Sequence, residues 1–191
     1  MTTLNPTSQT FTLNSGAQIP AVGLGTWKSP PDQVRKAVCH ALQKGYRHID
    51  TALNYQNEVE VGQGIRDSGV PRDQIWVTTK LDNPWHHRVR EGFKKSLSDL
   101  GIEYIDLYLV HFPCSTDPND PSKHLPEWDF VKTWWVVRID MLKNLLLTQQ
   151  PGKKCKSYWT PAKSGTLVCP TFRFVTWRSF SATRPARLLL R

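Results

Sequence analysis

Three ionisable side chains, Asp50, Lys80 and His111, each close a short apolar run of the sequence. The runs have the composition of buried β-strands, and Tyr55 lies in the segment that follows the first of them. In a barrel built from alternating strands and helices, the carboxyl ends of the strands carry the active site. The pattern therefore predicts a single site that contains all four side chains.

These four side chains form a coherent set for giving a proton to a carbonyl oxygen. A phenol has a pKa of about 10, and it donates a proton poorly at neutral pH unless a cation stabilises its phenolate. Lys80 would supply that cation to Tyr55, and Asp50 would be the counter-ion that a buried ammonium needs. A neutral His111 would donate a hydrogen bond that orients the substrate. Because no group in the set is nucleophilic, a nicotinamide would supply a hydride.

Strand and helix signals alternate along the segment that must position this set. We expect a hairpin at 11–13 and 18–20, then strands at 21–25, 47–50, 75–79 and 104–110, and helices from Pro30 to near Gly45, at 57–68 and at 86–100. The inward faces of the helices are predicted to be Val34, Ala37, Val38, Ala41 and Leu42, then Val59, Gly62 and Ile65, then Val89, Phe93 and Leu97. This order indicates an α/β fold with parallel strands and right-handed crossovers.

Composition limits the classes of protein that the chain can represent. Its 191 residues fall short of the roughly 250 of a complete eight-stranded barrel. The first residues resemble no secretory leader and no apolar run reaches membrane-spanning length, so we expect a soluble, cytoplasmic protein. The four cysteines, Cys39, Cys114, Cys155 and Cys169, have neither disulfide-scaffold nor zinc-site spacing, and we expect no metal.

The net charge of +9 is distributed unevenly along the chain. Residues 1–130 hold 13 Lys and Arg against 15 Asp and Glu, whereas residues 131–191 hold 12 basic residues and a single acidic one, Asp140. The excess positive charge therefore belongs to the last third of the chain, which needs its own explanation.

The motifs around the four side chains resemble those of the aldo-keto reductase family. The resemblance rests on residues 45–52 with Glu58 and Gly62, and on residues 25–27, 79–81, 85–89 and 107–113, and it covers roughly residues 8–134. The 85–88 stretch is most similar to fungal members of the glycerol dehydrogenase and aldehyde reductase type. The resemblance implies a (β/α)8 barrel, or TIM barrel, that uses NADPH to reduce aldehydes and ketones, with no metal.

The same resemblance implies roles for individual residues. Asp50, Tyr55, Lys80 and His111 would form the catalytic tetrad, with Tyr55 as the general acid. Gly25, Thr26 and Asp50 would lie at the cofactor, and Trp27, Trp85 and His111 at a small carbonyl substrate. Other readings remain open: Trp27 as an aromatic plug under the barrel rim, Trp85 as an anchor for the next helix, His48 as a core histidine, His86 and His87 as helix-start residues, and Cys114 as incidental to the pocket.

Beyond Trp134 no further family motif is recognisable. We therefore divide the chain into 1–134, the N-terminal half of a barrel with a hairpin and about four βα units, and 135–191, an irregular, basic and poorly ordered tail. The tail is explained by out-of-frame or intron-derived sequence, by binding of single-stranded nucleic acid through its basic and aromatic residues, or by an unrecognised interaction segment. We favour the first explanation and do not expect a nucleic-acid partner.

A half barrel has physical consequences for activity. Four strands leave two sheet edges unpaired and the inner face wet, and the phosphate site of such barrels is commonly built after strands seven and eight. We expect a monomer when folded, a tendency to aggregate, and weak binding of NADPH.

Overall fold

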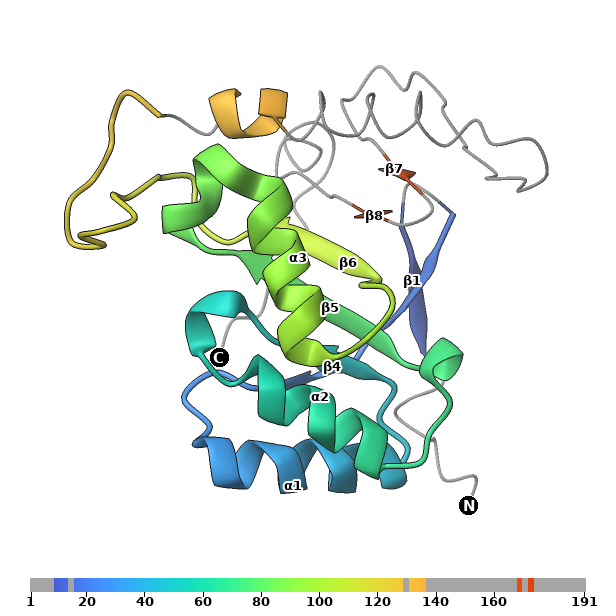
Figure 1. The fold of residues 1–191 in the computed structure, drawn as a ribbon. Coiled ribbons are helices and arrows are strands. Elements are labelled where there is room, and N and C mark those ends of the chain that lie inside the picture. The colour runs from blue at the N-terminus through green and yellow to red at the C-terminus, as the bar shows by residue number, and fades with distance from the viewer. Residues whose placement is uncertain (1–8, 14–15, 129–130, 137–167, 170–171, 174–191) are drawn as a thin grey trace, which may run out of the picture.

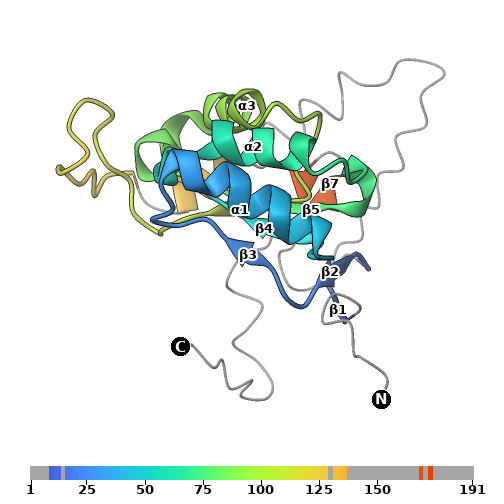
Figure 2. The same cartoon turned by 90° about the horizontal axis from the view of Figure 1, so that it is seen from below.

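The structure is a computed structural model that describes residues 9–13, 16–128, 131–136, 168–169 and 172–173. Its centre is a four-stranded parallel sheet in the order β3-β4-β5-β6. The strands are β3 (Leu24–Gly25), β4 (His48–Asp50), β5 (Trp76–Leu81) and β6 (Leu107–Val110). Three helices, α1 (Pro31–Gln43), α2 (Glu58–Asp67) and α3 (Val89–Leu100), lie along one face of the sheet (Figure 1, Figure 2). The predicted alternation of parallel strands and helices is confirmed.

The predicted N-terminal hairpin also forms. Strands β1 (Thr10–Thr12) and β2 (Gln18–Pro20) pair antiparallel, with Phe11 opposite Ile19. The hairpin is tied to the amino end of the sheet, since the carbonyl oxygen of Pro20 lies 3.3 Å from Nδ1 of His48, the first residue of β4.

Helix boundaries follow local chemistry. α1 begins at Pro31, whose missing N–H costs nothing in the first turn. The chain leaves this helix through Gly45, at φ +99°, and leaves α3 through Gly101, at φ +61°, a backbone conformation that glycine adopts without strain. Turns of this kind direct each helix back to the start of the next strand.

The core lies between the helices and the sheet. Its apolar side chains come from all three helices and from β4, β5 and β6, and removing them from water is the main stabilising contribution. The members of this buried cluster are Val34, Val38, Leu42, Ile49, Val61, Ile65, Ile75, Val77, Leu81, Val89, Phe93, Leu100, Ile105 and Tyr108.

α2 packs closely against both neighbouring helices because it presents glycines to them. A Cβ added at Gly62 would lie 1.9 Å from the carbonyl oxygen of Leu100, and one added at Gly64 would lie 2.6 Å from that of Arg35. The sequence therefore needs residues without side chains at these two contacts.

Several expectations about packing and boundaries were wrong. Val59 is 45% exposed, because the buried stripe of α2 runs through Val61 and Ile65, and Ala37 of α1 is exposed. The expected helix 86–100 divides into a 3-10 helix, Asn83–Arg88, followed by α3. The strand expected at 104–110 begins at Leu107, and β5 extends to Leu81, so Lys80 lies within the strand.

The predictions for the basic tail lie almost entirely outside the described residues. Residues 131–136 are helical, and two short strands, β7 (Val168–Cys169) and β8 (Phe172–Arg173), pair antiparallel. β7 includes Cys169, which lies in the tail that we expected to be irregular. The boundary at residue 134 and the nature of 135–191 stay predictions.

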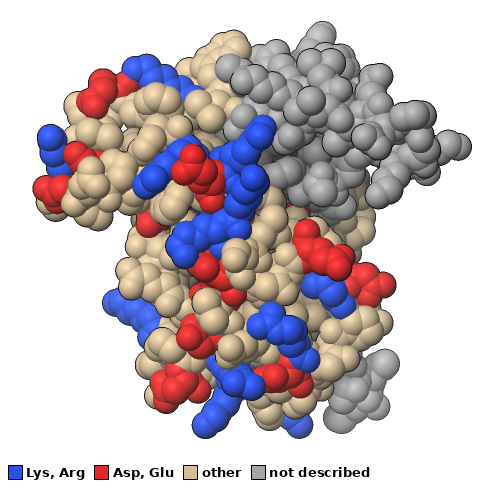
Figure 3. All heavy atoms as spheres, in the orientation of Figure 1, with Lys and Arg blue, Asp and Glu red and all other residues tan. Residues whose placement is uncertain are grey.

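The surface over the helices carries charges of both signs. Lys and Arg alternate with Asp and Glu across the face shown in Figure 3. No helix in the described part of the chain is long and apolar enough to cross a membrane.

Candidate active site

Lys80 is the centre of the candidate site. Its side chain is 12% exposed, and its ammonium donates to Asp50 Oδ1 at 2.5 Å and to the carbonyl oxygen of Thr51 at 2.8 Å. A third contact joins Lys80 Nζ to the phenol oxygen of Tyr55 at 3.3 Å. The buried cation is thus compensated by one carboxylate and two neutral oxygens, which is what a buried ammonium requires.

The sheet and one short connection bring these partners together. Asp50 is the last residue of β4, and its backbone lies opposite Thr78 of β5, so its side chain emerges on the same face as that of Lys80. Tyr55 closes a 3-10 helix, Leu53–Tyr55, which returns the chain over the end of β5. The local fold therefore brings the carboxylate and the phenol into contact with the same ammonium.

His111 completes the group predicted from the sequence. It follows β6 directly, and its backbone N–H donates to the carbonyl oxygen of Leu81 at 3.1 Å. The rings of His111 and Tyr55 meet edge to face, with their centroids 5.6 Å apart. Burial first, and then the nearby Lys80 ammonium, lower the pKa of His111, while Asp50 partly opposes this. The ring is therefore neutral at neutral pH, as a hydrogen-bond donor to a carbonyl oxygen needs to be.

Among the described side chains, His111 Nδ1 is buried without a hydrogen-bond partner. Phe112 stacks on the other face of the ring, with centroids 4.6 Å apart, and is itself 49% exposed. The site thus has an unsatisfied polar atom and an exposed aromatic ring beside Tyr55.

The residues expected at the cofactor lie next to Asp50. Gly25 ends β3 opposite Asp50 in the sheet register, and a Cβ added to it would meet no atom within 4 Å, which leaves open space beside the site. Thr26 is buried, and its hydroxyl donates to the hydroxyl of Thr51 at 2.9 Å. The Thr26 side chain therefore fixes the loop after β3, and the open space beside Asp50 lies at Gly25.

The two tryptophans expected at the substrate have different surroundings. Trp27 is 67% exposed, with Lys28 Nζ 4.5 Å above its ring. It is a rim residue and not a buried plug. Trp85 is half-buried, packs near Gly92 of α3 and carries the Arg88 guanidinium 4.3 Å above its ring. Its role as an anchor for α3 has direct support, and substrate contact by either tryptophan stays a prediction.

The other histidines and Cys114 have structural partners. His48 shares the face of Asp50, and its Nε2 lies 3.0 Å from the hydroxyl of Thr78. His86 is fully buried, not simply a helix-start residue, and its Nδ1 lies 3.0 Å from Thr133 Oγ1, which ties residues 131–136 to the 3-10 helix. Cys114 Sγ accepts a weak bond from Asn83 at 3.5 Å.

Two residues that the sequence did not identify as functional, Asn57 and Glu58, hold the segments around the site in place. Asn57 Nδ2 donates to the carbonyl oxygens of Thr26 and Ser29, at 3.0 and 3.1 Å. Glu58, quoted only as part of a motif, accepts from the hydroxyl of Thr79 at 2.6 Å. A polar pair at the start of a helix ordinarily reads as a cap, so the pattern gave no sign that both side chains are buried.

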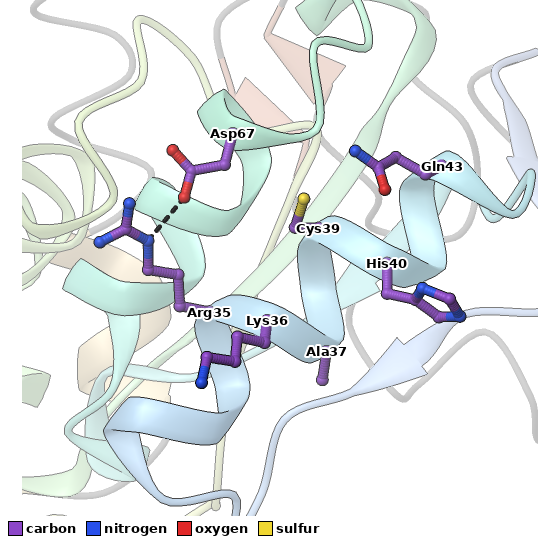
Figure 4. A pocket seen from close by; sticks show the side chains of 7 residues that line it. All are labelled: Arg35, Lys36, Ala37, Cys39, His40, Gln43 and Asp67. Carbon is purple, nitrogen blue, oxygen red and sulfur yellow. Dashed lines mark hydrogen bonds and ion pairs between the residues drawn. The ribbon is translucent and has the colours of Figure 1, made fainter.

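A shallow hollow of about 580 Å³ lies elsewhere, over α1, on the helical side of the sheet. In Figure 4, Arg35 of α1 reaches across to Asp67 of α2, and the pair is joined at 2.5 Å. None of the four candidate site residues lines this hollow. In the part of the chain that the structure describes, no three His, Cys, Asp or Glu side chains are grouped to hold a metal ion.

Comparisons with known proteins identify the family of the chain. The aldo/keto reductase family profile matches residues 21–150, past the last motif recognised at Trp134. Glycerol 2-dehydrogenase (NADP(+)) of Saccharomyces cerevisiae is 47% identical over 201 residues, which cover 88% of this chain and 62% of that protein. An aldehyde reductase of the same yeast is 44% identical over 71% of this chain and 49% of its own length.

A solved structure agrees as well. The crystal structure of a Bombyx mori aldo-keto reductase in complex with NADP matches with a TM-score of 0.65 and 41% identity, over 72% of this chain and 48% of that one. The chain thus spans about half to three-fifths of the length of these relatives. The resemblance to fungal enzymes of the glycerol dehydrogenase and aldehyde reductase type is confirmed. With a family match over most of its length and a parallel sheet to carry it, the chain belongs to the aldo/keto reductase family.

Proposed function

We propose that the chain carries the proton-donating site of an NADPH-dependent reductase of small aldehydes and ketones. One observation carries the proposal: the Lys80 ammonium is bonded at once to the Asp50 carboxylate and to the phenol oxygen of Tyr55, with a neutral His111 ring alongside. A cation held against a phenol favours release of the phenolic proton, which is the property that a general acid needs.

Each of the four residues has a task that its contacts allow. Tyr55 gives its proton to the substrate oxygen as negative charge develops there, and Lys80 stabilises the phenolate that remains. Asp50 and the carbonyl oxygen of Thr51 hold the ammonium in place. His111 donates a hydrogen bond to the same substrate oxygen and directs the carbonyl carbon away from the ring, where it can be attacked.

The open space at Gly25 lies beside Asp50 and leaves room for a ligand, so the cofactor residues proposed are Gly25, Thr26 and Asp50. NADPH, when bound there, supplies the hydride that the protein side chains cannot. The Bombyx mori relative is described in complex with NADP, and the yeast dehydrogenase is named for NADP, which supports this cofactor. The fold proposed around the site is the (β/α)8 barrel of the family.

The substrates proposed are small aldehydes and ketones, because the yeast relatives are named as a glycerol 2-dehydrogenase, whose product at C2 is a ketone, and an aldehyde reductase. Exposed Trp27 and Phe112 would supply the apolar walls of their pocket, and Trp85 its outer edge.

Substitution of the central lysine tests the proposal. Lys80→Met keeps the length of the side chain and removes its charge, so aldehyde-dependent oxidation of NADPH should fall by about 100-fold or more. Lys95→Met is the matched control, since it breaks an exposed pair with Asp99 on α3 and should leave turnover unchanged. Equal turnover in the Lys80→Met protein and the control would reject the proposed site.

A further inference from the structure

Glu58 is a buried carboxyl group that the proposed mechanism does not use. It is 3% exposed, opens α2, and its Oε1 accepts a hydrogen bond from Thr79 Oγ1 at 2.6 Å. Among the described residues its second oxygen, Oε2, is buried without a hydrogen-bond partner. Burying a carboxyl oxygen without a hydrogen-bond partner costs free energy, so the presence of Glu58 here calls for a structural reason.

The position of Thr79 supplies that reason. Thr79 and Lys80 are consecutive in β5, so their side chains point to opposite faces of the sheet. On one face Lys80 holds Tyr55, and on the other Thr79 holds Glu58. Tyr55 and Glu58 are only three residues apart. Lys80 and Thr79, which are adjacent in β5, therefore bind the two ends of the segment 55–58 from opposite faces of the sheet.

Other contacts make this segment stiff. The amides of Tyr55 and Gln56 donate to the carbonyl oxygens of Ala52 and Leu53, at 3.0 and 3.2 Å. Asn57 ties its far end to the loop after β3. Because the backbone between them is restrained, a shift of Glu58 would also shift Tyr55.

We propose that Glu58 is a positioning residue, which fixes Tyr55 against Lys80 through its hydrogen bond with Thr79. The expected effect on turnover rests on the proposed function. The restraint on residues 51–58 does not depend on any reaction.

The surroundings of Glu58 support a restraint that survives changes of charge. Burial raises its pKa to about 7, with Asp99 adding to the rise, while Thr79, Ser96 and Lys95 oppose it. Tyr108 of β6 is a further buried neighbour. Because a carboxyl oxygen accepts a hydrogen bond in either protonation state, Thr79 can hold Glu58 on both sides of neutrality.

The test compares two substitutions of the same buried hydroxyl in the full chain. Thr79→Val keeps the shape of the side chain and removes the donor, whereas Thr79→Ser keeps the donor. Amide hydrogen exchange, followed by mass spectrometry, should become at least about tenfold faster in residues 51–58 of Thr79→Val, but not in α1 and not in Thr79→Ser. In steady-state assays Thr79→Val should lower kcat about 10- to 100-fold with little change in KM.

Glu58→Gln, which still offers an oxygen to Thr79, should behave like wild type in both measurements. Equal exchange in the Val and Ser variants, or a rise in α1 as large as that in 51–58, overturns the restraint. A local rise with an unchanged kcat overturns its link to Tyr55. If wild type shows no turnover at all, the proposed function fails, and the exchange comparison still decides whether Glu58 restrains the segment.

Discussion

The nearly buried ammonium of Lys80 needs several oxygen partners. Its ammonium is almost removed from water and is acceptable there because Asp50, Thr51 and Tyr55 each offer an oxygen. Asp50, Lys80 and His111 were predictable from sequence because each is an ionisable residue at the end of an apolar run, and Tyr55 because it follows the first run closely. Asn57 and Glu58 were not, because their partners are distant in the sequence: the loop after β3 for Asn57 and strand β5 for Glu58.

Glu58 should make the free energy of unfolding depend on pH. Its pKa is about 7 in the folded protein against an ordinary value of 4.5, so the folded state binds the proton more tightly. The resulting stability is complete below pH 4.5 and is lost as the pH rises through 7, which amounts to about 3 kcal/mol.

Urea unfolding of wild type and Glu58→Gln between pH 4.5 and 8 measures this loss. Burial lowers the pKa values of His48 and His111, which contributes an opposite trend below pH 6.5, and the difference between the two proteins removes that trend. Wild type should lose stability relative to Glu58→Gln across the window. Parallel pH profiles for the two proteins would mean that Glu58 titrates in the usual range.

At the scale of elements, the order of strands and helices followed from periodicity and from prolines and glycines at helix ends. The extent of each element did not, because it depends on neighbours. β5 runs through Lys80 since β6 pairs with it as far as Leu81. The stripe of α2 rotates from Val59 to Val61 since Gly62 and Gly64 must face α3 and α1.

The close approach of α2 and α3 gives a direct prediction. Gly62→Ala would gain up to about 1 kcal/mol of helix propensity, but its Cβ meets the backbone of Leu100. We expect a net loss of about 3 kcal/mol in the free energy of unfolding, measured by chemical denaturation. Val59→Ala, on the exposed side of the same helix, should change stability by less than about 0.5 kcal/mol. Similar values for both variants would show that the helices separate easily.

At the scale of the whole molecule, the described parallel sheet has four strands, with β3 and β6 at its edges, and the chain spans about half to three-fifths of the length of its relatives. The sequence indicated a half barrel from its length and from the last motif at Trp134. The family profile matches as far as residue 150, so sequence similarity to the family extends beyond Trp134, where the last recognisable motif ends.

Cofactor affinity is the property that this architecture should affect most. Barrels of this kind commonly bind phosphate groups after strands seven and eight. We therefore expect NADPH to bind too weakly to saturate the chain at micromolar concentration, as followed by quenching of tryptophan fluorescence. Saturation in the micromolar range would show that the chain supplies a complete phosphate site.

The claim that Tyr55 donates the proton is tested most directly at NADPH concentrations high enough to offset weak binding. The measurement is the rate of aldehyde-dependent loss of nicotinamide absorbance in wild type and in Tyr55→Phe, with folding checked by circular dichroism. Because the phenol group is the proposed acid and its hydroxyl is bonded to Lys80, a contact that the fold does not depend on, we expect Tyr55→Phe to keep the fold and to lose about 100-fold or more of the rate. An undiminished rate in Tyr55→Phe, or no aldehyde-dependent rate in wild type, would contradict the account.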